Sequence, residues 1–398
     1  MPHMPDLPEL RVDDDLAALP ASEWNALLAQ SAHPTPFMRH EYLSALHESG
    51  SAAPEAGWAP LVLSLRQGTE LAAACVAYVK SHSYGEYVFD WAWADAYQRH
   101  GLEYYPKLLV AVPFTPVPGS RLLARDAASR SLLVQGLQTL AQQQRFSSVH
   151  LLFGDEADQA AARSQGWLTR SGVQFHWQSQ GHASFAEFLA SLQREKRKKI
   201  QQEQRRVREA DIEFEVRQGA QITAPDWDFF YRCYQLTYRA HRSTPYLTRE
   251  FFELMGSQMA ENWLMFVAKR GTERVAASLI ALDPEHRAAF GRYWGCVEPI
   301  PNLHFDACYY QPLAWCIANG YTRFEGGAQG EHKMARGLSP VSTHSSHWLA
   351  HPDFRNAVGE FLAREGQAMH AYVNELETHQ AYKQQTAPAG AVQQETEK

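Results

Sequence analysis

The stretch Trp263–Val297 reads WLMFVAKRGTERVAASLIALDPEHRAAFGRYWGCV, and it contains three apolar segments separated by two short polar returns. Apolar segments of this length that include aromatic residues and end at turn residues are typical of β-strands. Glycine in the first return favours a tight hairpin turn, because glycine adopts positive φ angles without steric cost. The stretch therefore predicts three consecutive strands joined by two tight connections.

A second copy of this arrangement stands earlier in the chain. The same turn, Gly-Thr-Glu, occurs at Gly68–Glu70 between two strand-like segments, 59–67 and 71–89. Both halves also follow one order of helices, a strand meander, a helix and a strand, which indicates duplication better than three shared residues do. We therefore expect an α/β (α+β) chain of two similar halves that meet along a cleft. The expected units are residues 1–180, residues 181–350, a C-terminal helix at 351–382 and a compositionally disordered tail at 383–398.

The composition is that of a soluble globular protein. The 398 residues are 45% hydrophobic and 20% charged, and the net charge is −7. The N-terminus lacks the pattern of a signal peptide, and no apolar run approaches the roughly 18–20 residues that span a bilayer. Five cysteines without a C-x-x-C pair suit a reducing compartment. We therefore expect a cytoplasmic protein with no transmembrane segment.

One strongly basic helix is predicted at 194–210. Eight Lys or Arg and two Glu occur between Arg194 and Arg208. At 100° per residue, one side collects cations that are candidates for binding a phosphate-bearing donor, a nucleic acid backbone or a membrane surface. These are Arg194, Arg197, Lys198, Arg205 and Arg208, of which the first four are the expected donor-binding residues. The alternative is a solvated helix that packs through a narrow apolar stripe, and the absence of interleaved aromatic residues leaves base stacking without support.

The segment Phe324–Gly337, FEGGAQGEHKMARG, gathers several kinds of chemistry around three glycines. Glu331 or His332 is a candidate general base, and Lys333 and Arg336 are candidates for neutralising phosphate or carboxylate. Glu325 and Gln329 are expected to contact substrate. The alternative is a capped turn with exposed charges. Histidines farther along the chain suggest zinc, but no carboxylate is placed with them at a metal-binding spacing, so we expect no metal and assign His344 to substrate contact.

Polar-tipped aromatic and charged residues gather beside glycine and proline in both halves. Such residues line clefts as often as they fill cores. We expect those of the first half to face a substrate groove between the halves: Tyr84, Tyr87, Asp90, Tyr105 and Lys107. The corresponding candidates of the second half are Arg292, Tyr293, Trp294, His304 and Tyr309.

Three long stretches together resemble one family. They are KSHSYGEYVFDWAWADAY with YYPKLLVAVPFTPVPGSRLL, then REKRKKIQQEQRRVREADIEF, and finally the region from GRYWGCVEPIPNLHFDACYY to STHSSHW. They resemble the FemAB-like group of predicted bacterial N-acyltransferases, whose members often carry the label of peptidoglycan biosynthesis or recognition proteins. The resemblance covers residues 36–365. It implies two GNAT-like acyltransferase folds in tandem, with the basic helix placed where Fem relatives have a helical arm that contacts aminoacyl-tRNA.

The resemblance also implies a donor substrate, either acyl-CoA or aminoacyl-tRNA. In acyl-CoA-using GNAT enzymes, backbone N–H groups of a glycine-containing loop before a helix hold the pyrophosphate. The corresponding segment here, CVEPIPNLHFDA, has two prolines, an acid and no glycine. Proline removes N–H donors and glutamate repels phosphate, so this segment argues against ordinary acetyl-CoA binding in the second half.

The function expected from these observations is transfer of an acyl or aminoacyl group to the amine of a small-molecule or cell-wall-precursor acceptor. A non-catalytic protein that keeps the fold and recognises a glycan or peptide precursor is the alternative. A third reading, a nucleic-acid-binding accessory that uses the basic helix, fits the net charge of −7 less well.

Overall fold

The three strands predicted over Trp263–Val297 form as β9 (Trp263–Arg270), β10 (Glu273–Asp283) and β11 (Ala288–Cys296). They pair antiparallel, with Arg270 opposite Glu273 at the first turn. Gly271 there has a φ of 57°, and Gly68 has a φ of 61° in the matching turn of the first half. Both Gly-Thr turns therefore use the left-handed conformation that glycine allows, and both hairpins are confirmed.

The computed structural model describes residues 8–327, 330–378 and 381–383, and in these residues the strands form one thirteen-stranded mixed sheet. The strand order is β1-β2-β3-β4-β6-β13-β7-β12-β11-β10-β9-β8, with β5 paired to β3 outside this path. The remaining strands are β1 (Glu9–Asp13), β2 (Trp58–Gln67), β3 (Glu70–Lys80), β4 (Lys107–Val110), β5 (Leu123–Ala124), β6 (Ser148–Leu152), β7 (Leu168–Gln178), β8 (Ile212–Gln218), β12 (Arg323–Glu325) and β13 (Ser339–Leu349). The order is nearly symmetric about the boundary between β13 and β7.

The two central strands are exchanged between the halves of the sequence. β7 belongs to the first half of the chain, yet it pairs with β12 of the second half. β13 comes near the end of the chain, yet its residues Ser345–Leu349 pair with β6 of the first half. β7 and β13 also pair with each other over nine residues of each strand. The sheet is therefore continuous, and each half contributes one strand to the other half's part of it.

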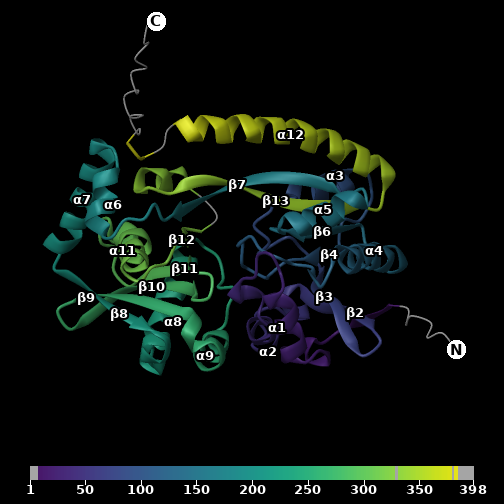
Figure 1. Ribbon diagram of the computed structural model, residues 1–398, viewed down its shortest axis with the longest axis horizontal. Helices are drawn as coiled ribbons and strands as arrows, with labels where there is room; N and C mark the ends of the chain where they lie inside the picture. Colours follow the sequence, from purple (N-terminus) through teal and green to yellow (C-terminus); the bar gives the residue numbers. More distant parts are fainter. Residues whose placement is uncertain (1–7, 328–329, 379–380, 384–398) are drawn as a thin grey trace, which may run out of the picture.

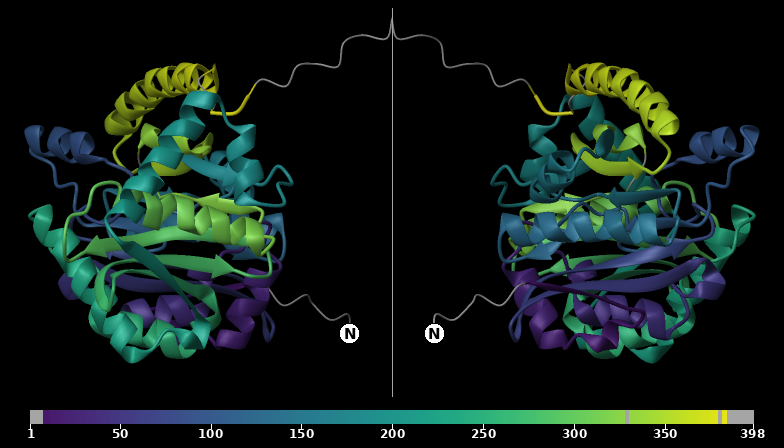
Figure 2. Two further views of the ribbon diagram at one scale, coloured as in Figure 1. Left: turned by 90° about the vertical axis from the view of Figure 1, so that its left-hand side faces the viewer. Right: turned by 90° about the vertical axis from the view of Figure 1, so that its right-hand side faces the viewer.

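Helices cover both faces of the sheet (Figures 1 and 2). One face carries a single hydrophobic core that contains residues of α1, α2, α8 and α9 and so spans both halves. The other face carries separate cores under α4 and α5 in the first half and under α6, α7 and α11 in the second. The helices are α1 (Ala21–Ala29), α2 (His40–Glu48), α3 (Trp91–Arg99), α4 (Ala127–Gln143), α5 (Glu156–Ser164), α6 (Phe185–Ser191), α7 (Arg194–Glu209), α8 (Ala224–Ala240), α9 (Arg249–Gln258), α10 (Leu303–Phe305), α11 (Gln311–Ala318) and α12 (Pro352–Thr378).

The long C-terminal helix α12 lies along β7 and β13, over the junction of the two halves (Figure 1). Arg170 of β7 and Glu365 of α12 form a two-bonded ion pair, with nitrogen–oxygen distances of 2.7 and 2.8 Å. At its N-terminal end, α12 packs against α3 through Phe354 and Tyr97, whose ring centroids are 4.0 Å apart. The helix therefore covers the place where the strands are exchanged.

The predicted fold class, a mixed α/β chain, is confirmed, and the basic helix forms as α7. One expected boundary differs from the structure, because the C-terminal helix expected at 351–382 is formed by Pro352–Thr378 and residues 381–383 lie outside it. A π-helical turn at Asp306–Tyr310 precedes α11, and Pro312 lies in the first turn of α11, where its missing N–H needs no partner. No helix in the described residues is long and apolar enough to cross a membrane. The division into two domains near residue 180 stays a prediction.

The exchanged strands predict that the halves do not fold independently. A fragment of residues 1–180 lacks β13 beside β6, and a fragment of residues 181–398 lacks β7 beside β12 and β13. Both fragments would expose unpaired strand edges and uncovered apolar faces, which promote aggregation. We expect each fragment expressed alone to be insoluble or without cooperative thermal unfolding, measured by circular dichroism. Co-expression should yield a soluble complex of the two fragments, and a cooperatively folding single fragment would contradict this reading.

Candidate functional site

A cavity opens where β11 and β12 stop running side by side. These parallel strands pair over Ala288–Phe290 and Arg323–Glu325. Beyond this pairing β11 continues to Cys296, whereas β12 ends at Glu325. Divergence at the carboxyl ends of parallel strands is a common origin of binding crevices. The cavity there has a volume of about 420 Å³. We call it the Arg292 cavity.

Arg292 enters this cavity from a bulge in β11. Opposite β10, Leu279 pairs with Tyr293 and Ile280 pairs with Gly291, so Arg292 has no partner residue across the strands. A bulge redirects the side chain of its extra residue. The guanidinium donates hydrogen bonds to the carbonyl of Phe114 at 2.9 Å and to the hydroxyls of Thr115 and Tyr293 at 3.2 and 3.1 Å. Its Nε has no hydrogen-bond partner among the described residues.

Aromatic rings from both halves form the walls of the Arg292 cavity. They are Tyr87, Phe114, Tyr234, Tyr238, Tyr246, Tyr293 and Trp294. Phe114 of the first half stacks on Tyr246 of the second, with ring centroids 4.7 Å apart and planes 9° apart. The cavity is therefore a composite of the two halves, and its use as a substrate groove stays a prediction.

Tyr87 connects this cavity to two others. One, of about 310 Å³, lies under the segment 83–91 and also contains Tyr84 and Tyr246; we call it the loop cavity. The other, of about 320 Å³, lies between β7, β13 and α12 and contains His344. Tyr87 lines all three and has a φ of 62°, a left-handed conformation that costs an ordinary residue free energy and is often kept at functional sites. A further cavity of about 380 Å³ beside Arg39 shares no lining residue with these three.

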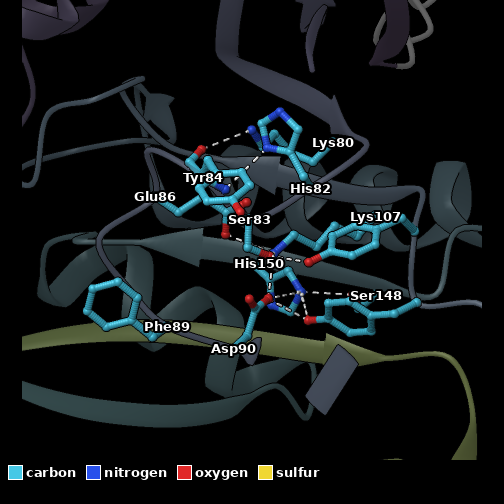
Figure 3. A network of polar contacts seen from close by, with 12 residues as sticks. Lys80, His82, Ser83, Tyr84, Glu86, Phe89, Asp90, Lys107, Ser148 and His150 are labelled. Atoms are coloured by element: carbon cyan, nitrogen blue, oxygen red, sulfur yellow. Dashed lines mark hydrogen bonds and ion pairs between the residues drawn. The ribbon is translucent and has the colours of Figure 1, made fainter. Parts of the chain in front are cut away.

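A buried ammonium group holds the segment that carries Tyr87. The Nζ of Lys107 donates to the hydroxyl of Ser83 and to a carboxylate oxygen of Glu86, each at 2.8 Å, and it also pairs with Asp90 (Figure 3). The Lys107 side chain is fully buried and the two carboxylates are nearly so. Burial raises the pKa of Glu86 to about 7, although Lys107 acts in the opposite direction. Burial opposes the charge of Asp90 as well, but Lys107 outweighs it and the pKa of Asp90 is lowered.

Hydrogen bonds continue from this group through the first half of the sheet. The hydroxyl of Tyr104 donates to Asp90 at 2.6 Å and contacts Nε2 of His150 at 3.0 Å. Nδ1 of His150 lies 2.7 Å from Nδ1 of His347 on β13, and burial holds the pKa of both histidines below the ordinary value. A buried neutral histidine pair thus joins β6 to β13, which is a structural role for His347.

The glycine-rich segment after β12 reaches the Arg292 cavity through Gly327. Lys333 donates from Nζ to the carbonyl of Gly327 at 2.7 Å, and Gly327 lines the cavity. Lys333 is buried, and burial lowers its pKa to about 8. His332 is exposed as a whole residue, and its Nε2 lies 3.3 Å from the Tyr309 hydroxyl. Partial desolvation of the imidazole, together with the positive charges of Arg336 and Lys333, lowers the pKa of His332. The rings of His304 and Trp294, 5.5 Å apart, continue from Tyr309 toward the cavity.

Arg336 is a structural partner of the basic helix. Its guanidinium contacts both carboxylate oxygens of Glu203 at 3.1 and 3.2 Å, and Glu203 also accepts from the Tyr310 hydroxyl. The same guanidinium lies over the ring of Phe305 at 3.6 Å. The hydrogen bonds to Glu203 are buried, so Arg336 fastens α7 to the π-helical turn. Glu203 lies between Ile200 and Val207 on the buried side of α7, where the alternative interpretation placed a narrow apolar stripe.

The other expected residues of this segment lie apart from one another. Glu331 is exposed and accepts a hydrogen bond from Tyr372 of α12. Glu325 is buried beside His176 of β7, at 3.7 Å between Oε2 and Nε2, and burial raises the pKa of Glu325 to about 7. Gln329 falls outside the described residues. On α7, Arg194, Lys198 and Arg205 are exposed and Arg197 is half-buried, so the expected cationic side faces solvent.

The structure thus brings part of the predicted set together. The predicted residues that line the three connected cavities are Tyr84, Tyr87, Arg292, Tyr293, Trp294 and His344. Asp90, Tyr105 and Lys107 lie behind them, with the Tyr105 hydroxyl 2.8 Å from that of Ser83. Tyr234 and Tyr238 of α8 were not predicted, although their spacing of four residues indicates one helix face. The described residues contain no group of three His, Cys, Asp or Glu that could hold a metal ion.

The class of protein follows from similar solved structures. Two solved structures align with this chain over nearly their whole length, and because the sequence identities are low, the likeness establishes the fold alone. "Crystal structure of FemX" has a TM-score of 0.53, 9% identity, and coverage of 86% of this chain and 98% of its own. "The structure of L-PGS from Bacillus licheniformis" has a TM-score of 0.52, 12% identity, and coverage of 86% and 97%. The chain is therefore a two-half protein of the FemX fold.

The family follows from the sequence. The model of the FemAB-like family, described as peptidoglycan biosynthesis/recognition, matches residues 15–384, so the chain belongs to this family. The comparison with curated proteins finds no match. The resemblance seen in the three long sequence stretches is confirmed.

The buried Lys107 group predicts a large loss of stability when the ammonium is removed. Lys107→Ala leaves Glu86 and Asp90 as buried carboxylates without their cation, which typically costs about 3–5 kcal/mol. We expect this decrease in the free energy of unfolding, measured by urea denaturation. Lys269→Ala is the matched control, because Lys269 pairs with Glu215 at a partly exposed site, where about 0–1 kcal/mol is expected. Equal losses in the two variants would contradict the assigned role.

The carboxyl of Glu325 predicts a pH-dependent stability. Its folded-state pKa is raised from 4.5 to about 7, so the folded protein keeps a proton that the unfolded chain releases. This contribution is complete below pH 4.5 and is lost as the pH rises through 7. Glu325→Gln cannot ionise, so its stability relative to the natural protein should rise by about 3 kcal/mol between pH 4.5 and pH 8. Urea denaturation at several pH values measures this difference, and a constant difference would refute the prediction.

Proposed function

We propose that this protein is an N-acyltransferase that moves an acyl or aminoacyl group onto the amine of a cell-wall-related acceptor. The reaction is placed in the Arg292 cavity. Membership of the FemAB-like family supports the link to peptidoglycan. The observation that carries the proposal is a composite aromatic cavity that a guanidinium, that of Arg292, also lines.

The cavity suits a bulky substrate with an anionic group. Aromatic walls bind flat or ring-shaped portions of a substrate, and a guanidinium recognises carboxylate or phosphate. Arg292 is held in place by the contacts of one terminal nitrogen with Phe114, Thr115 and Tyr293, and it lines the cavity. A glycopeptide precursor carries all of these features.

Lys333 contacts the lining residue Gly327, and His332 is linked to the cavity through the rings of Tyr309, His304 and Trp294. The acceptor nitrogen attacks the acyl carbonyl carbon, a C–N bond forms, and the bond from that carbon to the donor oxygen or sulfur breaks. Of the two candidates for the base that takes the ammonium proton, we prefer His332, because its lowered pKa keeps the imidazole neutral near pH 7. Glu331 is already hydrogen-bonded to Tyr372. Lys333, whose ammonium donates to the carbonyl of Gly327, is our candidate for balancing negative charge on the carbonyl oxygen or on the substrate.

Two observations favour aminoacyl-tRNA over acyl-CoA as the donor. The segment before α10 contains Pro299 and Pro301, which have no N–H, and the N–H groups of Leu303 and Phe305 already donate to the carbonyls of Ile300 and Asn302, so few free N–H groups are available to hold a pyrophosphate. The basic helix α7 exposes Arg194, Lys198 and Arg205, which suit a tRNA backbone. Both donors are compared in the experiment below.

Substitution of Arg292 tests the proposal. Purified protein is incubated with labelled aminoacyl-tRNA or labelled acyl-CoA and with amine-bearing peptidoglycan precursors, and labelled product is measured. We expect transfer by the natural protein and a decrease of about 10²-fold or more in Arg292→Gln, because an ionic contact to the substrate is lost. Arg274→Gln is the control, since Arg274 of β10 pairs with Asp226 of α8 and neither residue lines the cavity.

Several outcomes would change the assignment. Thermal unfolding of Arg292→Gln separates lost chemistry from lost folding, because Arg292 also supports Phe114. Lys198→Glu should lower transfer from aminoacyl-tRNA and leave transfer from acyl-CoA unchanged. Precursor binding without transfer from either donor would refute an enzyme and favour the recognition protein.

A further inference from the structure

The segment 83–91 is built in an unusual way for a surface loop. Ser83, Glu86 and Asp90 turn inward to the single ammonium of Lys107 (Figure 3). Three large aromatic residues turn outward, with exposed fractions of 59% for Tyr84, 55% for Phe89 and 41% for Trp91. Surface loops usually expose polar groups and bury apolar ones, so this loop has the reverse arrangement.

The inward contacts fix the outward rings in place. The ammonium of Lys107 binds the loop at three of its nine positions. The carbonyl of Phe89 also accepts a hydrogen bond from Arg170 at 2.6 Å. At Gly85, with a φ of 82°, an added Cβ would lie 2.6 Å from the ring of Phe114, so the backbone packs closely there. A loop held this firmly presents its rings without a large loss of conformational entropy on binding.

The outward rings enclose the loop cavity. Tyr84 and Trp91 have ring centroids 5.1 Å apart, and Tyr87 and Tyr246 complete the enclosure. Apart from these four rings, the lining consists of Ser83, Gly85 and Phe89. None of these seven described residues carries a charged side chain. The cavity of about 310 Å³ is therefore aromatic, uncharged and provided with a few hydroxyl groups.

These properties select one class of ligand. A phosphate or carboxylate would find no cation in the lining, and the nearby Lys107 is already saturated by Ser83, Glu86 and Asp90. An ammonium ligand would find no exposed carboxylate, because Glu86 and Asp90 are 4% and 3% exposed. A sugar ring has an apolar C–H face that packs on aromatic rings and a rim of hydroxyls that bond to serine and tyrosine.

We infer that the loop cavity binds an uncharged saccharide ring, stacked on Trp91 and Tyr84. The inference deepens the proposed function and rests on it in one respect. Tyr87 and Tyr246 line both this cavity and the Arg292 cavity, so a sugar held here belongs to a substrate that extends toward Arg292. The sugar subsite thus positions a glycan-linked acceptor for transfer.

Saturation-transfer NMR on the full-length protein tests the inference without a donor. The probes are the β-1,4-linked trimer of N-acetylglucosamine, maltotriose, and tetramethylammonium chloride. We expect saturation transfer to the C–H protons of at least one sugar and none to tetramethylammonium. Trp91→Ala and Tyr84→Ala should each weaken sugar binding at least tenfold. Phe361→Ala is the matched control, because Phe361 is a comparably exposed aromatic residue on α12, 39% exposed.

Each contrary result overturns the inference. Absence of sugar contact in the natural protein would do so, as would binding that survives both Trp91→Ala and Tyr84→Ala with unchanged thermal unfolding. Binding of tetramethylammonium that depends on Trp91 would replace the sugar site with a cation cage. The measurement needs no transfer, so failure of every transferase assay would leave a positive sugar result standing. An active transferase without sugar contact would overturn this inference alone.

Discussion

The candidate site depends on one ammonium group buried in the first half of the sheet. Lys107 lies on β4, and its three acceptors all come from the segment that connects β3 to α3. Desolvating a lysine and two carboxylates is unfavourable unless their geometry is well matched, so the segment has little freedom to adopt another path. Its path places Tyr87 in a left-handed conformation at the meeting point of three cavities. The shape of the site therefore follows from an interaction that itself lies outside the cavities.

Arg292 makes the corresponding connection from the second half. It leaves β11 at a bulge and donates to the backbone of Phe114, which belongs to the first half. Phe114 in turn stacks on Tyr246 of the second half. Neither half alone contains a closed wall around the Arg292 cavity. The relative position of the halves is consequently part of the site, and the continuous sheet under it keeps that position constant.

Local patterns in the sequence predicted the parts of this structure that local interactions determine. The two Gly-Thr turns, the three strands after Trp263 and the basic helix follow from residue periodicity and backbone preference, and they form as expected. The pairing of β13 with β6 was not predicted, because a strand carries no local mark of a partner nearly two hundred residues away. Glu203 was missed for a related reason. From the sequence alone, a glutamate on a basic helix is expected to be a solvated charge. Only the structure shows that Glu203 pairs with the buried Arg336.

The same distinction applies to the site. Tyr84, Tyr87 and Arg292 were expected at a cleft because polar-tipped side chains beside glycine and proline often occur there, and all three line cavities. In the sequence, Glu331 and His332 were equal candidates for the general base, and Lys333 and Arg336 were equal candidates for binding an anion, since all four follow the same glycines. The structure gives Arg336 a buried structural ion pair and Glu331 a partner on α12. Tertiary partners, which sequence spacing does not reveal, separate the four residues.

The exchange of β7 and β13 has a consequence for the order in which the molecule is made. A ribosome releases the chain from its N-terminus, so β6 emerges long before residues 339–349, its partner strand. During that interval the first half has an open strand edge, and β7 is present without either of its neighbours, β12 and β13. The first half must therefore remain unaggregated until β13 has been translated. The helix α12 follows β13 in the chain and then covers the junction of the two halves.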